Sequence, residues 1–422
     1  MFDIVKSKEK DKKILERLNK STKKTVKSRE NHLLGYENTK NIEVDTYIAV
    51  YFSDFLYAYT DLHNKVIIDD INILKNKKVI LHNACVQLRD IRNKYGDDFY
   101  CYWDTKIFNK ILDKDEKVTS PEDIFNLFIK QKEELKEFMP NKDSRISTIQ
   151  REIKVLNITN KMSKRGFTIK DIPEELEKYV IDNKLYFTID TFASKTGRMY
   201  TKNPNVQGFT KELRKYLSAK DNYSLISADF SSQEPRILAY LSQDENMLNA
   251  YKNNIDVYSE IASKVFNKDY VDCLEYKDGV FSESGYELRK KAKTILFSII
   301  YGGYSSKDFY EKYPKVKDFI DNINGKDETI YNRKIKIDKN PVNTLIQGSA
   351  SDMTKNTVIK IEEDKELKDL GFELLLPIHD EIIGQCPNEN IEKCSERIKY
   401  LMENIDDRIM MKVDIKIMKN LE

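Results

Sequence analysis

The clearest pattern of hydrophobic and polar positions lies in the second half of the 422-residue chain. Residues 223–228 alternate between apolar and polar side chains, which predicts a strand, and Asp229 follows directly. Residues 374–383 predict a strand, a turn and a second strand, with Asp380 at the tip. Two carboxylates at strand ends are suited to share a pair of divalent cations.

A helix is predicted between these two aspartates. Arg289, Lys293, Phe297 and Tyr301 recur every four residues, and because each helical residue turns by about 100°, they stay on one stripe. A glycine pair directly after Tyr301 predicts the end of the helix. Aromatic residues at this spacing are more often core residues, but here two cations share their face. Cations that face a metal-bound triphosphate, with aromatic rings beyond them, are what a nucleotide-adding enzyme needs.

The N-terminal half predicts a small α/β region followed by helices. Residues 47–60 are rich in aromatic and β-branched side chains, and residues 78–82 form a second short apolar run, so both are expected to be strands. Residues 120–139 begin with Ser-Pro-Glu, a helix start, and continue with an apolar face. Residues 144–166 combine an apolar face with several Lys and Arg residues and predict another helix.

Composition limits the classes of partner. The 72 Lys and Arg residues against 70 Asp and Glu residues leave a formal net charge of +2, so affinity for a polyanion must come from local patches. Residues 1–30 form such a patch, with eleven basic and five acidic residues, although a solvated terminal helix is the more ordinary interpretation. The five cysteines lack C-x-x-C spacing and are expected to be reduced thiols, not zinc ligands. No stretch of eighteen apolar residues occurs, so we expect a soluble, unexported protein.

Five segments together resemble one known family. Residues 227–236, 289–303 and 374–383 resemble motifs A, B and C of the family A DNA polymerases, the polymerase I family, and the chain is similar to its small phage-type members. Residues 196–208 and 343–353 match two further segments in family order. Any one segment alone would be a weak signal, whereas five in order are specific.

The resemblance implies an α/β (α+β) fold of the right-hand polymerase type. It would have an antiparallel-sheet palm, helical fingers, a shortened helical thumb and an N-terminal exonuclease-like α/β domain. The predicted segments are a basic N-terminal segment (1–30), a degenerate 3′–5′ exonuclease-like domain (31–115), a shortened thumb or connector (116–185), the palm with motif A (186–243), the fingers with motif B (244–340) and the palm with motif C (341–422).

The acids of motifs A and C are the expected metal ligands. The resemblance implies that Asp229 and Asp380 hold two Mg²⁺ ions, with Mn²⁺ as an alternative, and that the Phe230 carbonyl is a backbone ligand. Glu381 would be an accessory catalytic carboxylate. The structural alternative is a polar hairpin turn, but an acidic pair between apolar runs is costly to bury without cations.

The helix stripe is expected to bind the incoming nucleotide. Arg289 and Lys293 match the residues that bind the triphosphate, with Lys293 nearer the α-phosphate, and the alternative is an exposed basic helix face. Phe297 would pack on the sugar and base, and Tyr301 would close the insertion site behind the template base. Tyr258 stands where many relatives have a triphosphate-binding His, and a phenol can donate one hydrogen bond to phosphate but brings no charge.

Glu234 matches the residue that selects the sugar in this family. A carboxylate pressed under the sugar leaves no room for a 2′ hydroxyl, so ribonucleotides are rejected. Its neighbours Gln233 and Pro235 depart from the common pattern, and the local backbone is expected to differ. Arg236 is expected to be a buried structural partner of nearby acids.

Four residues match positions that contact the primer–template minor groove in the family: Arg198, Asn343, Gln347 and His379. The groove presents acceptor atoms that all correct base pairs share, so these side chains could detect pairing without reading sequence. The alternative for each is a capping or hydrogen-bonded core group.

Residues 81–91 and 103–112 resemble two segments of the 3′–5′ exonuclease domain of many family members. The position that the family fills with Asp is Gln87, and the nearest candidate for the family's Asp-x-Glu pair, Asp45-Thr46-Tyr47, has no acid at its third position. A neutral amide supplies no charge for Mg²⁺, so the nuclease chemistry is expected to be lost. Asp104 would then be an ordinary capping or surface acid. An unrelated α/β domain is the alternative.

The resulting hypothesis is template-directed, primer-dependent DNA synthesis from dNTPs by two-metal-ion nucleotidyl transfer, without proofreading. The expected partners are primer–template DNA, dNTPs and a replication protein such as a processivity factor or primase, which would compensate for the small thumb; no membrane is involved. The expected location is the cytoplasm of a bacterium or of a phage-infected cell.

Three other functions remain open from the sequence. A non-catalytic DNA-binding relic is disfavoured by the retention of Asp229, Lys293 and Asp380 together. A nuclease acting through the N-terminal region is disfavoured by Gln87. An RNA polymerase is disfavoured by Glu234.

Overall fold

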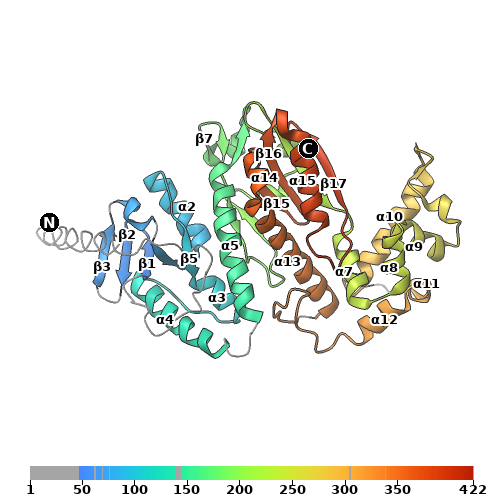
Figure 1. The fold of residues 1–422 in the computed structure, drawn as a ribbon, viewed down its shortest axis with the longest axis horizontal. Helices are drawn as coiled ribbons and strands as arrows, with labels where there is room; N and C mark the ends of the chain where they lie inside the picture. Colours follow the sequence, from blue (N-terminus) through green and yellow to red (C-terminus); the bar gives the residue numbers. More distant parts are fainter. Residues whose placement is uncertain are drawn as a thin grey trace, which may run out of the picture. The chain divides into compact units, whose positions relative to one another are not determined.

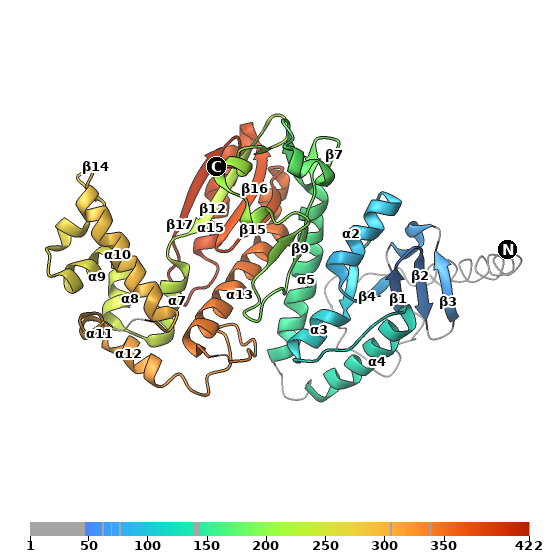
Figure 2. The same ribbon diagram turned by 180° about the vertical axis from the view of Figure 1, so that it is seen from behind.

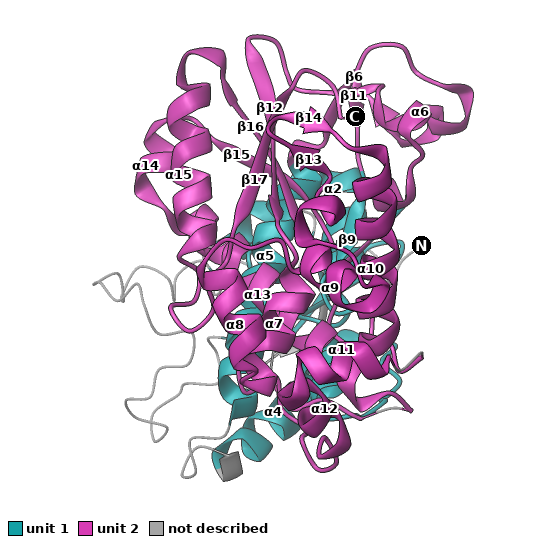
Figure 3. Ribbon diagram, turned by 90° about the vertical axis from the view of Figure 1, so that its right-hand side faces the viewer, with its two compact units in different colours: residues 1–164, 187–192, 201–204 teal, residues 165–186, 193–200, 205–422 magenta. Residues whose placement is uncertain are grey.

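The computed structural model describes residues 47–60, 63–68, 70–75, 77–138, 144–303, 306–337 and 339–421. The predicted basic segment 1–30 and Asp45 lie outside the described residues. The chain forms two compact units, coloured in Figure 3: unit 1 comprises residues 1–164, 187–192 and 201–204, and unit 2 comprises residues 165–186, 193–200 and 205–422. This division is coarser than the six predicted segments, which stay predictions. None of the described helices combines the length and apolar composition needed to cross a membrane.

Unit 1 is built on a five-stranded mixed sheet in the order β3-β2-β1-β4-β5 (Figure 1). Its strands are β1 (Tyr47–Phe52), β2 (Leu56–Thr60), β3 (His63–Ile68), β4 (Lys78–Leu81) and β5 (Cys101–Asp104). The first three strands pair antiparallel, whereas β4 pairs parallel with both β1 and β5. The single strand predicted for residues 47–60 is therefore two strands, because the chain turns at Ser53, whose N–H donates to the Phe55 carbonyl at 3.2 Å.

Alternate residues of β1 enter two hydrophobic clusters on opposite faces of this sheet. Ile48 and Val50 pack in one cluster with Leu88, and Tyr47 packs in the other with Phe128. The helices of this region are α2 (Ala84–Tyr95), α3 (Thr105–Ile111), α4 (Pro121–Phe138) and α5 (Ser144–Arg165). The helices predicted for residues 120–139 and 144–166 are thus confirmed.

Unit 2 contains a four-stranded antiparallel sheet in the order β15-β16-β12-β17. Its strands are β12 (Tyr223–Phe230), β15 (Glu373–Ile378), β16 (Glu381–Pro387) and β17 (Val413–Met418). Helices α13 (Pro341–Glu363) and α15 (Ile391–Glu403) pack against it (Figures 1 and 2). β12 runs two residues beyond the predicted strand because Asp229 and Phe230 also pair with β17.

The close fit between β16 and its surroundings depends on Gly384. A Cβ at this position would lie 2.1 Å from Cζ of Phe372, which is nearer than any real contact. The strand therefore tolerates no side chain there.

The other elements of unit 2 are short sheets and helices. A second antiparallel sheet has the order β11-β6-β8-β7, from β6 (Phe167–Ile169), β7 (Val180–Ile181), β8 (Lys184–Leu185) and β11 (Leu217–Ser218). A two-stranded sheet is formed by β13 (Tyr276–Lys277) with β14 (Val280–Phe281). A further two-stranded sheet pairs β9 (Thr188–Asp190), which belongs to unit 1, with β10 (Tyr200–Lys202), which lies at the boundary of the two units. The remaining helices are α6 (Lys211–Arg214), α7 (Gln233–Ser242), α8 (Glu245–Lys252), α9 (Val257–Phe266), α10 (Glu283–Ile300), α11 (Lys307–Lys312), α12 (Pro314–Asp321) and α14 (Lys365–Asp369).

Helix α10 carries the predicted basic and aromatic stripe. Ser282 caps its N-terminus by accepting a hydrogen bond from the Gly285 N–H, and Tyr301 is its C-cap residue. The helix ends at the glycine pair, as predicted, with Gly302 in the left-handed region at φ 74°.

Candidate active site

Four acidic residues meet at one end of the antiparallel sheet. Asp229 at the end of β12 is opposite Glu381 of β16 on one side and Asp414 of β17 on the other. Asp380 lies in the turn between β15 and β16, and its carbonyl accepts a hydrogen bond from the Phe230 N–H at 3.2 Å. The strand pairing therefore brings two aspartates together that are far apart in the sequence.

The environment of Asp229 is unfavourable for an isolated carboxylate. Burial, followed by the negative charges of Asp380, Glu381 and Asp414, raises its pKa to about 7. Its Oδ1 atom is buried and has no hydrogen-bond partner among the described residues. Burial also raises the pKa of Asp380. A bound cation would relieve both the repulsion and the missing hydrogen bond.

The donor set fits a hard cation that takes most of its ligands from elsewhere. The described residues contain no group of three or more His, Cys, Asp or Glu side chains arranged to hold a metal ion. Mg²⁺ is commonly held by only one or two protein carboxylates together with water and substrate phosphates. Asp229, Asp380 and the Phe230 carbonyl could supply that protein share. Glu381 is held differently, because its carboxylate accepts a hydrogen bond from the Ser227 hydroxyl on the neighbouring strand.

A cavity of about 450 Å³ adjoins the aspartates, and residues from several elements line it. Eleven of the residues predicted from sequence are among them: Arg198, Asp229, Phe230, Glu234, Tyr258, Arg289, Lys293, Phe297, Tyr301, His379 and Asp380. Glu381, Asn343 and Gln347 are not in its lining. The carboxylates and the α10 stripe thus face one space.

The two cations of α10 share an aromatic neighbour, Tyr258 of α9. The Arg289 guanidinium lies 5.0 Å from the centre of this ring, and the Lys293 ammonium lies 5.8 Å from it. Lys293 is also 5.8 Å from the Phe297 ring. Burial raises the pKa of the Tyr258 hydroxyl. The ring of Tyr258 therefore supports the cations from one side by cation–π contact.

Arg289 is held by two acids that the sequence interpretation missed. Its Nε donates to Asp256 Oδ2 at 2.7 Å, and its guanidinium is 3.5 Å from Glu275. Burial alone would lower the pKa of Arg289, but the bond to Asp256 and its charge outweigh burial, and the pKa is raised. Asp256 also caps α9. The capping pattern was the available signal for Asp256. Lys293, by contrast, has no carboxylate within ion-pair distance in the described part of the chain.

Glu234 is nearly buried, with 8% of its surface exposed, and both of its carboxylate oxygens are hydrogen-bonded. Arg198 donates to Oε1 at 2.6 Å, and the Tyr301 hydroxyl donates to Oε2 at 3.2 Å. Burial raises the pKa of this carboxylate, although the Arg198 charge acts in the opposite direction. The carboxylate is thus fixed in place at the cavity wall.

The start of α7 explains how the chain accommodates the unusual neighbours of Glu234. Pro235 lies in the first turn, where a backbone N–H has no acceptor within the helix, so its missing donor does not break α7. Arg236 is buried, as expected, and the charges of Glu403 and Asp414 act on it, but its hydrogen bonds go to the carbonyls of Ser231 and Met410 at 2.9 and 2.6 Å. The guanidinium also stacks 4.3 Å from the Tyr251 ring.

Of the four residues predicted to contact the minor groove, two line the cavity and two do not. Arg198 and His379 line the cavity. Gln347 of α13 accepts a hydrogen bond from the Thr196 hydroxyl at 2.9 Å, and Asn343 has a buried Nδ2 without a partner among the described residues.

The exonuclease-like segments in unit 1 have structural partners. Gln87 Oε1 accepts from the Phe52 N–H at 2.7 Å, and its amide donates to the Phe52 carbonyl. Asp104 caps α3 and accepts a further hydrogen bond from the Ala84 N–H at 2.7 Å. The prediction that Asp104 is a capping acid is confirmed. The loss of nuclease chemistry stays a prediction.

Comparison with known proteins identifies the family. The sequence profile of DNA polymerase family A matches residues 100–422. The chain belongs to DNA polymerase family A. It is 30% identical to DNA polymerase I of Caldicellulosiruptor bescii, over 55% of this chain and 31% of the relative, and 31% identical to that of Borreliella burgdorferi, over 52% and 28%. The chain therefore spans about a third of the length of these curated relatives.

A solved structure shows the same fold. The polymerase domain of Pol1 from M. smegmatis, in complex with DNA primer-template and dNTP, is similar with a TM-score of 0.72, over 89% of this chain and 95% of that chain, at 14% identity. The predicted fold class is confirmed. The assignments of the palm to the antiparallel sheet of unit 2 and of motif B to α10 stay predictions.

Proposed function

We propose that this chain catalyses template-directed, primer-dependent DNA synthesis from dNTPs, using divalent metal ions and without proofreading. The observation that carries the proposal is the meeting of Asp229 and Asp380 with the α10 stripe around one cavity. Neither feature alone indicates nucleotidyl transfer, but the reaction needs both a metal-binding face and a triphosphate-binding face. Membership in family A and the fold of the solved relative support the proposal.

The metal-binding face consists of Asp229, Asp380 and the Phe230 carbonyl. When bound, two Mg²⁺ ions, or Mn²⁺, would activate the primer 3′ oxygen and neutralise the α-phosphate and the pyrophosphate. The aspartates hold the charge that such ions need, and their raised pKa values reflect the cost of keeping that charge together without cations. Glu381 supports the same end of the sheet as an accessory carboxylate.

The opposite face binds the nucleotide. Lys293 attracts the triphosphate as a compact point charge, and Arg289 attracts it as a planar fork. To bind Arg289, the triphosphate would compete with Asp256 and Glu275, which pair with the guanidinium in this structure. Phe297 packs on the sugar and base, and Tyr301 closes the site behind the template base. The two rings lie 5.9 Å apart on consecutive turns, which leaves them adjacent on the cavity wall.

Sugar selection is assigned to Glu234. Its carboxylate is held at both oxygens, so it cannot move aside for a 2′ hydroxyl without breaking a hydrogen bond.

Arg198 and His379, together with Asn343 and Gln347 of α13, are proposed to contact the primer–template. A processivity factor or primase as a further partner, and a cytoplasmic location, belong to the same proposal.

Primer extension tests the proposed function. The protein should extend a labelled primer on a defined template with dNTPs and Mg²⁺, and Asp229→Ala and Asp380→Ala should each reduce extension by several orders of magnitude. Full activity of either variant would remove the basis of the proposal. Titration with dNTP and Mg²⁺ in the absence of DNA distinguishes an enzyme from a DNA-binding relic, because only the enzyme is expected to bind both.

A further inference from the structure

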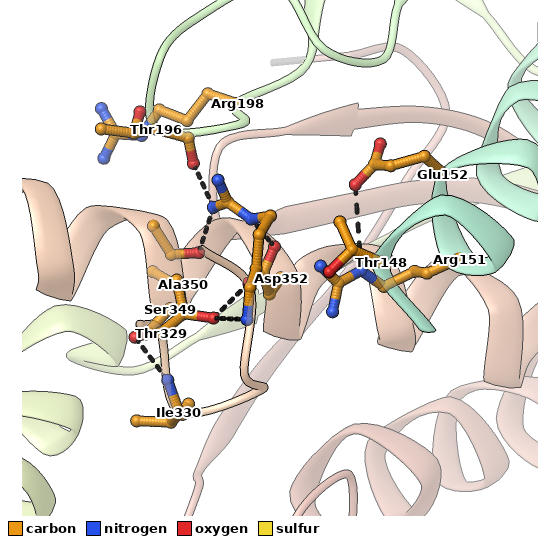
Figure 4. Close-up of polar contacts among 12 residues, drawn as sticks. Thr148, Arg151, Glu152, Thr196, Arg198, Thr329, Ile330, Ser349, Ala350 and Asp352 are labelled. Carbon is orange, nitrogen blue, oxygen red and sulfur yellow. Dashed lines mark hydrogen bonds and ion pairs between the residues drawn. The ribbon is translucent and has the colours of Figure 1, made fainter. Parts of the chain in front are cut away.

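A buried ion pair links the loop before α13 to that helix. Arg333 is 1% exposed and Asp352 is 0% exposed, with Nε 2.8 Å from Oδ1. The Thr329 hydroxyl donates to the other Asp352 oxygen at 2.7 Å (Figure 4). A buried pair of charges is stable only when its remaining donors and acceptors are satisfied, so the other N–H groups of Arg333 also need hydrogen-bond acceptors.

One of these acceptors lies in α13, and the other lies on a segment that is distant in the sequence. Arg333 donates from one guanidinium nitrogen to the Thr196 carbonyl at 2.7 Å and to the Gly348 carbonyl at 3.1 Å. The Thr196 hydroxyl donates in turn to Gln347 of α13 at 2.9 Å. Residues 193–200 are thus tied to α13 through the guanidinium and through one side-chain bond.

This segment packs so closely on the guanidinium that an added side chain would displace it. Gly197 has φ +81°, and a Cβ there would lie 3.0 Å from one Arg333 nitrogen and 3.1 Å from its central carbon. From the other side, a Cβ on Gly348 would lie 3.1 Å from the Thr329 methyl group and 3.2 Å from an Arg333 nitrogen. Two glycines therefore enclose the guanidinium. The next residue after Gly197 is Arg198, which holds Glu234.

We propose that Arg333 is a positioning residue for sugar selection. The buried guanidinium fixes residues 193–200 on α13 and so keeps Arg198 within hydrogen-bonding distance of Glu234. Displacing Arg333 moves Arg198, which leaves the Glu234 carboxylate with Tyr301 as its remaining side-chain donor among those described here. The carboxylate then gains freedom, and the space under the sugar opens to a 2′ hydroxyl. This inference rests on the proposed function.

The glycines allow a test that leaves every polar group in place. Gly197→Ala presses a methyl group on the guanidinium from the segment side. Gly348→Ala presses a methyl group on both the guanidinium and the Thr329 methyl from the interior of α13, where Ala is favoured over Gly as a helix former. Gly279→Ala is the matched control, because Gly279 has the same φ of +81° but nothing within 4 Å of a Cβ. Arg198→Ala serves as the reference for complete loss of the contact.

The measurement is the ratio of kcat/KM for a dNTP to that for the matching rNTP at one template position, with thermal unfolding of each variant alongside. Loss of one charged hydrogen bond that contributes to sugar selection corresponds to a change in this ratio of about tenfold or more. We expect that fall in the ratio for Arg198→Ala and Gly197→Ala, a fall in the same direction for Gly348→Ala, and no change for Gly279→Ala. Gly348→Ala decides the question if Gly197→Ala does not fold.

An unchanged ratio in a folded Gly197→Ala or Gly348→Ala variant would overturn the inference, even if both nucleotides were incorporated more slowly. Equal falls for Gly197→Ala and Gly279→Ala would also overturn it, since backbone strain would then be the cause. A wild-type protein that extends no primer would instead overturn the proposed function, and this inference with it.

Discussion

Replacing Asp229 by Asn is expected to stabilise the metal-free protein while abolishing DNA synthesis. Asp229 shares one end of the sheet with Asp380, Glu381 and Asp414, and its pKa of about 7 reflects burial and the repulsion among them. The amide has nearly the same shape but no charge. The substitution therefore removes the repulsion without creating a cavity.

The size of the effect follows from the pKa. In the unfolded chain this carboxyl has its ordinary pKa of 3.8. The higher pKa in the folded protein means that ionising the carboxyl at pH 8 lowers the free energy of unfolding by at most about 4 kcal/mol. Asp229 is partly exposed, and screening by solvent reduces this to about 1–2 kcal/mol. A gain of this size would raise the unfolding temperature by roughly 2–4 °C or more.

The pH dependence has a definite sign. Below about pH 4 the carboxyl is protonated in both the folded and unfolded states, so the variant and the wild type should be equally stable with respect to this group. Between pH 4 and 7 the unfolded chain ionises while the folded protein retains the proton. The advantage of Asp229→Asn should therefore grow over this range and be constant above about pH 7.

Thermal unfolding with and without Mg²⁺ is the assay. Mg²⁺ at a hundred times its dissociation constant should stabilise the wild type by about 2.7 kcal/mol and the variant by clearly less. Asp221→Asn is a suitable control, because this side chain is 87% exposed and its loss should change stability by no more than about 0.5 kcal/mol. If Asp229→Asn were less stable than the wild type in metal-free buffer at pH 8, the reasoning about clustered charge would be refuted.

Four further predictions concern single side chains. Tyr258→Phe should keep the dNTP KM within about twofold of the wild-type value, because the ring contacts to the cations remain, whereas Tyr258→Leu should raise the KM about fivefold or more. Steady-state kinetics measures both, and a severe defect in the Phe variant would mean that the hydroxyl contacts phosphate. Lys293→Ala should reduce kcat by about a hundredfold or more, measured by single-turnover incorporation, and an unchanged kcat would remove Lys293 from the site. Glu234→Ala should lower the preference for dNTPs over rNTPs by at least about tenfold in competition assays, and retained preference would contradict its role. Gln87→Ala should lower the free energy of unfolding by about 1–2 kcal/mol, since both bonds to Phe52 are lost, and neither it nor the wild type should degrade a 3′ single-stranded end.

The sequence was most informative where chemistry and periodicity coincide. The alternation before Asp229 and the four-residue spacing on α10 reflect backbone geometry that holds in any fold, so the strand and the helix could be predicted. The meeting of Asp229 with Asp380 could only be expected through the resemblance, since pairing of β12 with β16 is a tertiary contact.

The parts that could not be predicted depend on which side chains are neighbours in space. Asp414 lies in a short strand near the C-terminus that carries no motif, although it pairs directly with Asp229. The buried position of Arg333 was equally hidden, because a basic residue in a polar loop predicts solvent exposure, whereas here the charge is buried against Asp352. The carbonyl acceptors of Arg236 were not foreseen, because backbone acceptors leave no trace in the sequence.

The central claim is that Asp229 and Asp380 jointly hold the metal ions for templated nucleotide addition. Single-nucleotide incorporation opposite each of the four template bases tests it most directly, using the wild type, Asp229→Asn and Asp380→Asn. The account predicts that the wild type adds the complementary dNTP in each case and only with a divalent cation, and that both variants lose the activity while remaining folded. Complementary addition by either variant at the wild-type rate, or by the wild type in excess chelator, would contradict it.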